Sequence, residues 1–408
     1  MPRPARDVAC GGPIEATVPK MSVRAQRASW FDYVVLSAAL AGIAFIVAYF
    51  DGVHYAVRND FAISWTVSDL LWQGKLSDIY DPPRFAAIYH AHFSENVGVP
   101  FWPYPPIALF LVAPVGLLPP FLSYLAWSIV TLALFAASVR SFFGDNRRVL
   151  MLVLAPSSCA NIVLGQTGFV TAALLVGGLA MIDRRPLIAG ALFGLLAFKP
   201  QFGIMLPLAL LAARLWKPFV AAALTALAAA AASVAAFGIE AWRGYLEVML
   251  PFELSFSQRA TSSYILKALT VSEAARLMGA SASFAYLVQA LAVLAAAGVV
   301  IWAYRRMRER SAQAAVLLAG TALACPHLHV YDMSIVSVAA VVLAEAARAE
   351  PPGFSERLTI TLAWVAPLAL IALFALHILQ VPHDPYVLAA LAPLITAVLM
   401  CYIVARLR

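Results

Sequence analysis

Apolar residues run through this chain in long stretches separated by short polar segments or by proline and glycine. Many stretches are about 15 to 22 residues long, enough to cross roughly 30 Å of hydrocarbon as α-helix. An outer-membrane barrel would instead show strands of alternating polarity. We therefore predict an all-α polytopic membrane protein with about 11 to 13 transmembrane helices. The candidate spans are residues 31–50, 107–118, 121–139, 149–163, 169–182, 187–198, 202–215, 219–237, 284–304, 314–324, 333–346, 358–379 and 387–404.

Composition excludes a soluble domain of this size. Of 408 residues, 63% are hydrophobic and 12% are charged, and the mean hydropathy is +0.85. A soluble globular chain carries about 25% charged residues. The four cysteines, Cys10, Cys159, Cys325 and Cys401, are far apart, so neither a disulfide framework nor a zinc site is indicated.

Basic residues predict the orientation, because Arg and Lys are enriched in cytoplasmic loops. Residues 1–29 carry five basic side chains without an apolar core, so we expect a basic cytoplasmic tail. The other basic positions expected inside are Arg184, Arg185, Arg214, Lys217, Arg305, Arg306, Arg308, Arg357, Arg406 and Arg408. The formal net charge of +7 is mostly explained in this way, and its scatter over short loops argues against nucleic-acid binding.

Alternation from these loops predicts the outer face. It places outside the loops 51–103 and 238–282, Gly165 with Gln166, Lys199, and His327 with His329. Alternation fails once, because three candidate spans lie between the first loop and Gly165. One possibility is that the stretch 107–118, bracketed by proline pairs, dips into the membrane without crossing it.

The two long outer loops mix aromatic and charged residues, a pattern that suits helices lying in the membrane interface. We divide the chain into the tail 1–29, a catalytic transmembrane module 30–346 that includes both loops, and C-terminal helices 347–408.

Polar groups that gather at one face of a membrane protein are candidates for function, because such groups are expensive near lipid. Eight side chains are expected at the outer face: Arg58, Asp60, Tyr104, Gln166, Lys199, Arg259, His327 and His329. Each has an ordinary alternative. A lone aspartate is more often a solvated interfacial carboxylate, Lys199 a snorkelling lysine, Gly165–Gln166 a turn, and Tyr104 with Trp102 part of an aromatic belt.

The ordered set Asp60-Phe61, Gly74, Tyr80-Asp81, Tyr104-Pro105-Pro106, Gly165-Gln166, Lys199-Pro200 and Pro326-His327-Leu328-His329 carries a resemblance. Over residues 31 to 346 the chain resembles the polyprenyl-phosphate-mannose-dependent mannosyltransferases of the C-type (GT-C) glycosyltransferase superfamily, including the mycobacterial phosphatidylinositol-mannoside mannosyltransferases. The match departs from a generic member in its Ala-rich span at 221–236 and in lacking two adjacent acids in the first loop.

This resemblance implies an enzyme of the bacterial inner membrane with its active site facing the periplasm. It transfers a sugar, mannose in that family, from a polyprenyl-phosphate donor to a hydroxyl of a lipid or glycolipid, with inversion. The family's loop aspartate, the proposed general base, corresponds to Asp60. One base suffices for an inverting displacement, because a phosphate leaves without protonation.

The remaining site residues follow from charge and polarity. Lys199 is the first candidate to bind the donor phosphate, with Arg58, Arg259 and His329 as further candidates. We expect Gln166, His327, Tyr104 and Trp102 to contact the sugar or acceptor. No cofactor is expected, and no metal, although a site made of His327, His329 and Asp332 remains an alternative.

A transporter or flippase of a lipid-linked sugar is the competing function. It predicts broken helices and ionisable groups near mid-membrane, often in two related halves. A purely structural envelope protein is a third possibility, and it predicts no convergence of polar residues at one face.

Overall fold

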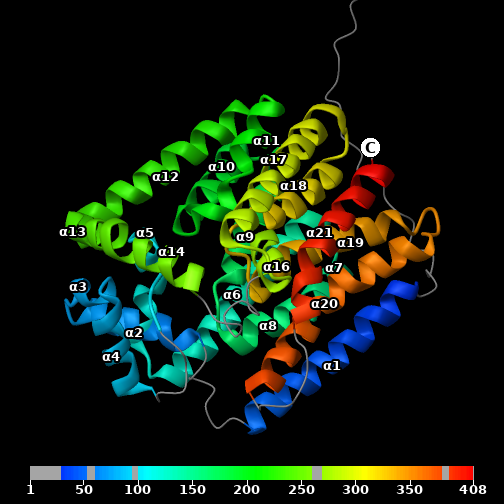
Figure 1. The fold of residues 1–408 in the computed structure, drawn as a ribbon. Coiled ribbons are helices and arrows are strands. Elements are labelled where there is room, and N and C mark those ends of the chain that lie inside the picture. Colours follow the sequence, from blue (N-terminus) through cyan, green and yellow to red (C-terminus); the bar gives the residue numbers. More distant parts are fainter. Residues whose placement is uncertain (1–28, 53–59, 94–99, 260–268, 379–385, 408) are drawn as a thin grey trace, which may run out of the picture.

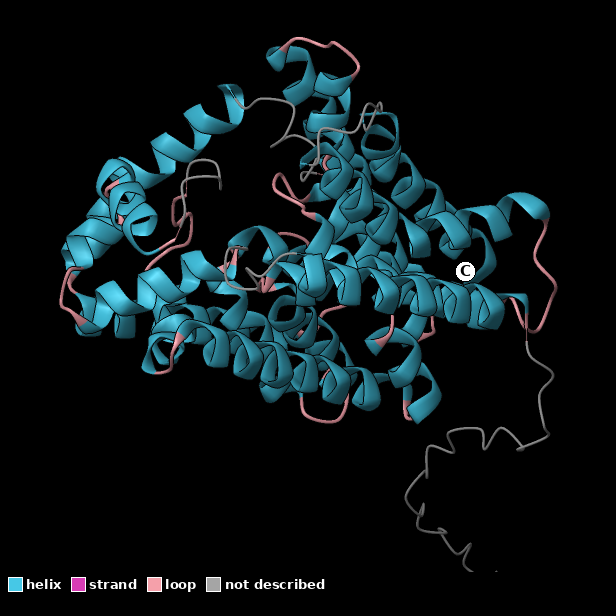
Figure 2. Ribbon diagram, turned by 90° about the horizontal axis from the view of Figure 1, so that it is seen from below, coloured by secondary structure: helices cyan, strands magenta, loops and turns pink. Residues whose placement is uncertain are grey.

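The protein is a bundle of helices (Figures 1 and 2). The computed structural model describes residues 29–52, 60–93, 100–259, 269–378 and 386–407. Within these ranges every regular element is helical, and no strand is present. The prediction of an all-α protein is therefore confirmed.

The helices follow one another through short turns. The α-helices before the second long loop are α1 (Trp30–Gly52), α2 (Phe61–Trp72), α3 (Leu76–Ile79), α4 (Pro82–His92), α5 (Ile107–Val112), α6 (Pro120–Phe143), α7 (Asn146–Val153), α8 (Pro156–Leu164), α9 (Gly168–Met181), α10 (Pro186–Leu195), α11 (Leu206–Ala212) and α12 (Trp216–Phe237). Those after it are α13 (Ile239–Arg243), α14 (Leu250–Arg259), α16 (Val271–Leu277), α17 (Ala282–Arg306), α18 (Arg310–Ala324), α19 (Ser334–Ala346), α20 (Phe354–Ile378) and α21 (Tyr386–Leu407). Shorter helical turns are η1 (Ala113–Leu117), η2 (Leu196–Phe198), η3 (Pro200–Gly203), the π-helical η4 (Gly244–Met249) and η5 (Val330–Met333).

Six helices among the described residues are long and apolar enough to cross a membrane, or seven if the bent pair α7 and α8 forms one span. The chain thus has the architecture of a multi-pass membrane protein, but the expected 11 to 13 crossings are not confirmed. Several expected spans are too short as helices. The stretch 169–182 becomes the 14 residues of α9, which rise only about 21 Å against roughly 30 Å of hydrocarbon. The stretch 202–215 becomes η3 and the seven residues of α11.

The core is built around α18 and α19. Every residue from Ala312 to Ala324 in α18 is buried, and α19 is buried from Ser334 to Ala344. These helices consist largely of Ala, Val and Leu, so they pack closely with their neighbours α17, α20 and α21.

In contrast, α12 presents most of its surface outward, and only Pro218 and Ser233 are buried. It lies along α10 (Figure 1). Gly190 and Gly194 of α10 permit this approach, since a Cβ on Gly190 would lie 2.6 Å from Ala221 Cβ and one on Gly194 2.6 Å from Thr225 Cβ. This small-xxx-small pairing is typical of membrane helices, and it gives the Ala-rich span a packing role.

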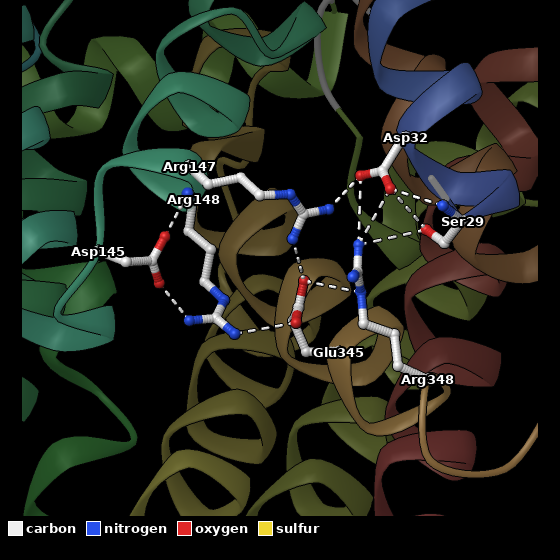
Figure 3. A network of polar contacts seen from close by, with 7 residues as sticks. All are labelled: Ser29, Asp32, Asp145, Arg147, Arg148, Glu345 and Arg348. Carbon is white, nitrogen blue, oxygen red and sulfur yellow. Dashed lines mark hydrogen bonds and ion pairs between the residues drawn. The ribbon is translucent and has the colours of Figure 1, made fainter. Parts of the chain in front are cut away.

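One end of the bundle is held together by ion pairs (Figure 3). Arg147 and Arg348 both contact Asp32, while Arg148 contacts Asp145, and all three arginines reach Glu345. Asp32 lies at the start of α1, Asp145 just before α7 and both neighbouring arginines in its first turn, while Glu345 lies at the end of α19 and Arg348 follows it. Elsewhere among the turns expected in the cytoplasm, Arg310 pairs with Asp183 at 2.8 Å and Arg406 with Glu356 at 2.7 Å.

The opposite ends of these helices carry the loops expected outside. The backbone N–H of Leu269, just before α16, donates to the carbonyl of Leu328, 2.7 Å away. The end of the second long loop therefore lies against the segment that carries His327 and His329. These contacts between turns agree with the grouping that charge alternation predicts, and the assignment of the groups to cytoplasm and periplasm stays a prediction.

The stretch 107–118 packs along α2. It contains the six residues of α5 and then η1, and both pack on α2. The Ser68 hydroxyl and the Trp72 indole each donate to the carbonyl of Ala113 at 2.7 Å, and the Trp65 indole donates to Leu118. These bonds agree with the possibility that 107–118 does not cross the membrane, and the number of crossings before Gly165 stays a prediction.

The two long loops form short helices that lie near each other on the left of Figure 1. α3 packs against α13, and Phe101 makes ring contacts with Phe252 and Phe256 of α14, with centroids 5.3 and 5.1 Å apart. Whether these helices lie in the membrane interface stays a prediction.

Candidate functional site

Asp60 immediately precedes α2 and occupies its N-cap position. An aspartate there normally accepts hydrogen bonds from the first turn of its own helix. Asp60 instead has helical backbone angles and makes no such capping bond. Its Oδ2 atom accepts a hydrogen bond from Gln166 Nε2 at 3.2 Å, across 106 residues of sequence. The carboxylate is thus directed toward another loop and is partly exposed.

The turn that carries Gln166 depends on glycine. α8 ends at Gly165, whose φ of +62° lies in the left-handed region that favours glycine. A Cβ at Gly165 would lie 2.5 Å from the Cβ of Phe61, the residue that follows Asp60. The absence of a side chain therefore lets the turn approach the start of α2, and this brings Gln166 within hydrogen-bonding distance of Asp60.

Lys199 and Asp332 form a buried ion pair between the η2–η3 turn and η5. Lys199 Nζ lies 3.0 Å from Asp332 Oδ1, and the two side chains are 3% and 0% exposed. Three aromatic rings surround the ammonium: its nitrogen lies 5.0 Å from the Tyr331 ring centroid, 5.2 Å from that of Phe202 and 5.7 Å from that of Tyr104. This geometry matches cation–π contacts in a desolvated setting.

The segment before η5 places the two histidines on the same loop as Asp332. The His329 backbone N–H donates to Asp332 Oδ2 at 3.3 Å, and the His329 ring stacks on Tyr331 with centroids 5.2 Å apart. Burial lowers the pKa of His327 below its usual value, which favours the neutral imidazole.

Tyr104 joins these two parts of the site. Its phenol lies within electrostatic range of Asp60, Lys199 and Asp332, so the expected base and the expected phosphate ligand both lie near this one residue. The Tyr80 hydroxyl donates to the Tyr104 carbonyl at 3.2 Å. The Trp102 ring packs against Tyr104 at a tilt of 59°, with centroids 4.6 Å apart, and Trp102 is only 1% exposed. Trp102 therefore supports Tyr104 from the protein side and is not open to a sugar in this conformation.

Two predicted phosphate ligands cannot be placed. Arg58 lies outside the described residues, and Arg259 ends α14 with a side chain outside the described part of the structure. Of the nine predicted site residues, the structure brings seven into one region: Asp60, Trp102, Tyr104, Gln166, Lys199, His327 and His329.

The alternative metal site is not formed. Within the described part of the chain, no three His, Cys, Asp or Glu side chains converge as metal ligands. Both carboxylate oxygens of Asp332 are already engaged, one with Lys199 and one with the His329 backbone.

Sequence reasoning overlooked Asp332 as the partner of Lys199, and Tyr331 as part of its surroundings. A pointer was present, because a lysine at the end of an apolar stretch is almost never buried without a counter-charge. Asp332 is the acidic residue nearest to the predicted histidine loop, but only the folded chain shows that the pair spans 133 residues of sequence.

Comparison with known proteins identifies the family. The sequence model of glycosyltransferase family 87 matches residues 102–326, slightly more than half of the chain. The matched stretch includes Tyr104, Gln166 and Lys199, while Asp60 precedes it and Asp332 follows it. No curated protein and no solved structure matches the chain. The chain belongs to glycosyltransferase family 87, a family of the GT-C type.

Proposed function

We propose that the protein transfers a sugar from a polyprenyl-phosphate donor to a hydroxyl group of a lipid or glycolipid, in one inverting step with Asp60 as general base. The observation that carries the proposal is the position of the Asp60 carboxylate and the Lys199–Asp332 pair near the same tyrosine, Tyr104, in a chain of a glycosyltransferase family.

The proposed chemistry needs one carboxylate at the acceptor. The acceptor hydroxyl attacks the anomeric carbon from the side opposite the phosphate, and Asp60 takes up the hydroxyl proton as the new bond forms. The bond from the anomeric carbon to the phosphate oxygen breaks with its electron pair on that oxygen. Polyprenyl phosphate then leaves as an anion, so no second acid is required.

The leaving phosphate gains negative charge, which donors held in place beforehand stabilise. We still propose that Lys199 binds the donor phosphate, although it does so as a paired cation and not as a free one. Together with Asp332 it is electrically neutral, so it offers no long-range attraction. It offers a fixed ammonium with three N–H donors, of which one is directed at Asp332 Oδ1. His329 stacks on Tyr331 beside it and is the second proposed phosphate contact.

The donor sugar and the acceptor are proposed from the resemblance to the polyprenyl-phosphate-mannose enzymes. We propose mannose as the sugar, a periplasmic active site in the bacterial inner membrane, and Tyr104 and His327 as contacts to sugar or acceptor. Two features of this structure agree with a lipid donor. The site lies at the ends of membrane helices, and the described residues around it contain no Asp-X-Asp of the kind that binds a nucleotide diphosphate through a metal.

The test uses the purified full-length protein in nanodiscs. It should transfer radiolabelled mannose from polyprenyl-phosphate-mannose to a lipid extract of its host and ignore GDP-mannose, and mass spectrometry should identify the acceptor. Transfer from GDP-mannose alone would overturn the lipid donor. Movement of lipid-linked sugar across a vesicle membrane without glycosylation would overturn the enzymatic proposal in favour of transport.

A further inference from the structure

Gln166 is held in one orientation by bonds at both ends of its side-chain amide. Its Nε2 atom donates to Asp60 Oδ2 at 3.2 Å, and its Oε1 atom accepts from the Thr167 backbone N–H at 3.4 Å. The Trp127 indole donates to the backbone carbonyl of Gln166, also at 3.4 Å. These contacts assign the amide orientation, since the oxygen faces a backbone donor and the NH₂ group faces a carboxylate.

We propose that Gln166 is a positioning residue for Asp60, and that it is not primarily a ligand of the sugar. This inference rests on the proposed function of Asp60 as general base. Gln166 fixes the rotation of the Asp60 carboxylate through Oδ2, so the carboxylate meets the acceptor hydroxyl in a constant orientation.

A side-chain amide is well suited to hold the Asp60 carboxylate. A glutamine N–H is a permanent donor that cannot titrate, and it stabilises an ionised carboxylate without adding a charge. The Asp60 side chain makes no capping bond to α2, and its bond to Gln166 comes from another element. The Gly165 turn, packed on Phe61, gives this bond a rigid support from α8 and α9.

The groups that affect the charge on Asp60 come from several elements. Among the described residues, Tyr104 lies within electrostatic range of both Asp60 and the Lys199–Asp332 pair. The pair is neutral as a whole, and Gln166 is uncharged. A carboxylate introduced at position 166 would place a negative charge directly beside Asp60, where the amide now donates to Oδ2, so the pH dependence is a direct test.

The experiment compares Gln166→Met and Gln166→Glu with wild type over a range of pH, in nanodiscs. Gln166→Met removes the donor at similar size, and we expect kcat to fall about ten- to a hundredfold, as for loss of a hydrogen bond to a charged group. The KM for the lipid donor should change less than about twofold. Gln166→Glu places a second carboxylate beside Asp60, and like charges raise the pKa of one of the pair. The acid limb of its pH–rate profile should move to higher pH by about one to three units.

The chain supplies a matched control. Gln73 Nε2 donates to Asp69 Oδ2 at 2.7 Å in an exposed Gln–Asp pair on α2. Gln73→Met and Gln73→Glu should leave kcat, KM and the pH profile unchanged. A raised KM in Gln166→Met, with kcat and the pH profile of both Gln166 variants unmoved, would overturn the inference and make Gln166 a substrate ligand.

An Asp60→Asn enzyme distinguishes failure of the positioning role of Gln166 from failure of the proposed base role of Asp60. If Asp60→Asn retains wild-type turnover, the proposed base is wrong whatever Gln166 does. If Asp60→Asn is inactive while both Gln166 variants behave like wild type, the base stands and the positioning role is wrong.

Discussion

Replacing either member of the Lys199–Asp332 pair should destabilise the protein, whereas replacing both should not. The single variants are Lys199→Met and Asp332→Leu, and the double variant combines them. Each single change leaves one charge buried without its partner, with side chains that are 3% and 0% exposed in the folded protein. Orphaning a buried charge costs about 3–5 kcal/mol, while replacing a whole buried pair by apolar residues is often neutral or stabilising.

The three aromatic rings around Lys199 affect the two singles differently. The rings of Tyr104, Phe202 and Tyr331 face the ammonium, and cation–π contacts with desolvated cations are worth up to about 2 kcal/mol. They partly compensate an unpaired Lys199 but offer nothing to an unpaired Asp332 carboxylate. Lys199→Met should therefore be the more damaging single change, and the coupling energy of the cycle should reach at least about 3 kcal/mol.

Equilibrium unfolding in mixed micelles of SDS and dodecyl maltoside measures these differences. The exposed Arg310–Asp183 pair, with side chains 42% and 52% exposed, is the control, and its single variants should cost under about 1 kcal/mol. If the buried pair's single variants cost no more than the control variants, or if the double variant is as unstable as the singles combined, the buried-pair argument is refuted. The double variant should fold but should still lose sugar transfer, because the proposed contact of Lys199 with the donor phosphate is gone.

Three further predictions concern the turn, the orientation and the metal. Gly165→Ala should lower kcat at least about tenfold, since a Cβ at φ +62° would meet Phe61 and displace Gln166 from Asp60. The control is Gly203→Ala, where a Cβ meets nothing within 4 Å. Equal kcat values for the two variants would contradict the mechanism. The orientation is tested by single cysteines in a protein from which Cys10 and Cys401 have been removed. A cysteine replacing the exposed Met278 before α17 should react with a membrane-impermeant thiol reagent in intact cells, and one replacing Arg306 at the other end of α17 should not. The reverse labelling pattern would place the site in the cytoplasm. Transfer should persist in EDTA, because both Asp332 oxygens are engaged, and loss of activity that Mg²⁺ or Mn²⁺ restores would revive a metal site.

Much of this protein follows from its sequence for simple physical reasons. Apolar stretches predict membrane helices because lipid tolerates little else, and charge alternation predicts which turns share an end of the bundle. The ion pairs of Asp32 with Arg147 and Arg348 bear out that grouping. The expectation that Asp60 and Gln166 lie at one face is likewise met by a direct hydrogen bond.

The rest depends on three-dimensional packing that the order of residues does not reveal. Hydropathy marks an apolar stretch but not where it bends, so 149–163 reads as one span although α7 and α8 meet at 52°. An aromatic residue beside a polar loop looks like a sugar contact, yet Trp102 is buried behind Tyr104. Lys199 looks like a free interfacial cation until Asp332, far along the chain, is found against it.

The role of Asp60 is measured most directly by single-turnover transfer, with the Asp60→Asn enzyme supplied with polyprenyl-phosphate-mannose and its identified acceptor. Asparagine keeps the size and polarity of the side chain but cannot take up the acceptor proton. We expect normal folding, donor binding like that of wild type, and transfer at least about a hundredfold slower, the lower end for general-base catalysis. Transfer within about tenfold of the wild-type rate would contradict the assignment of Asp60 as the base.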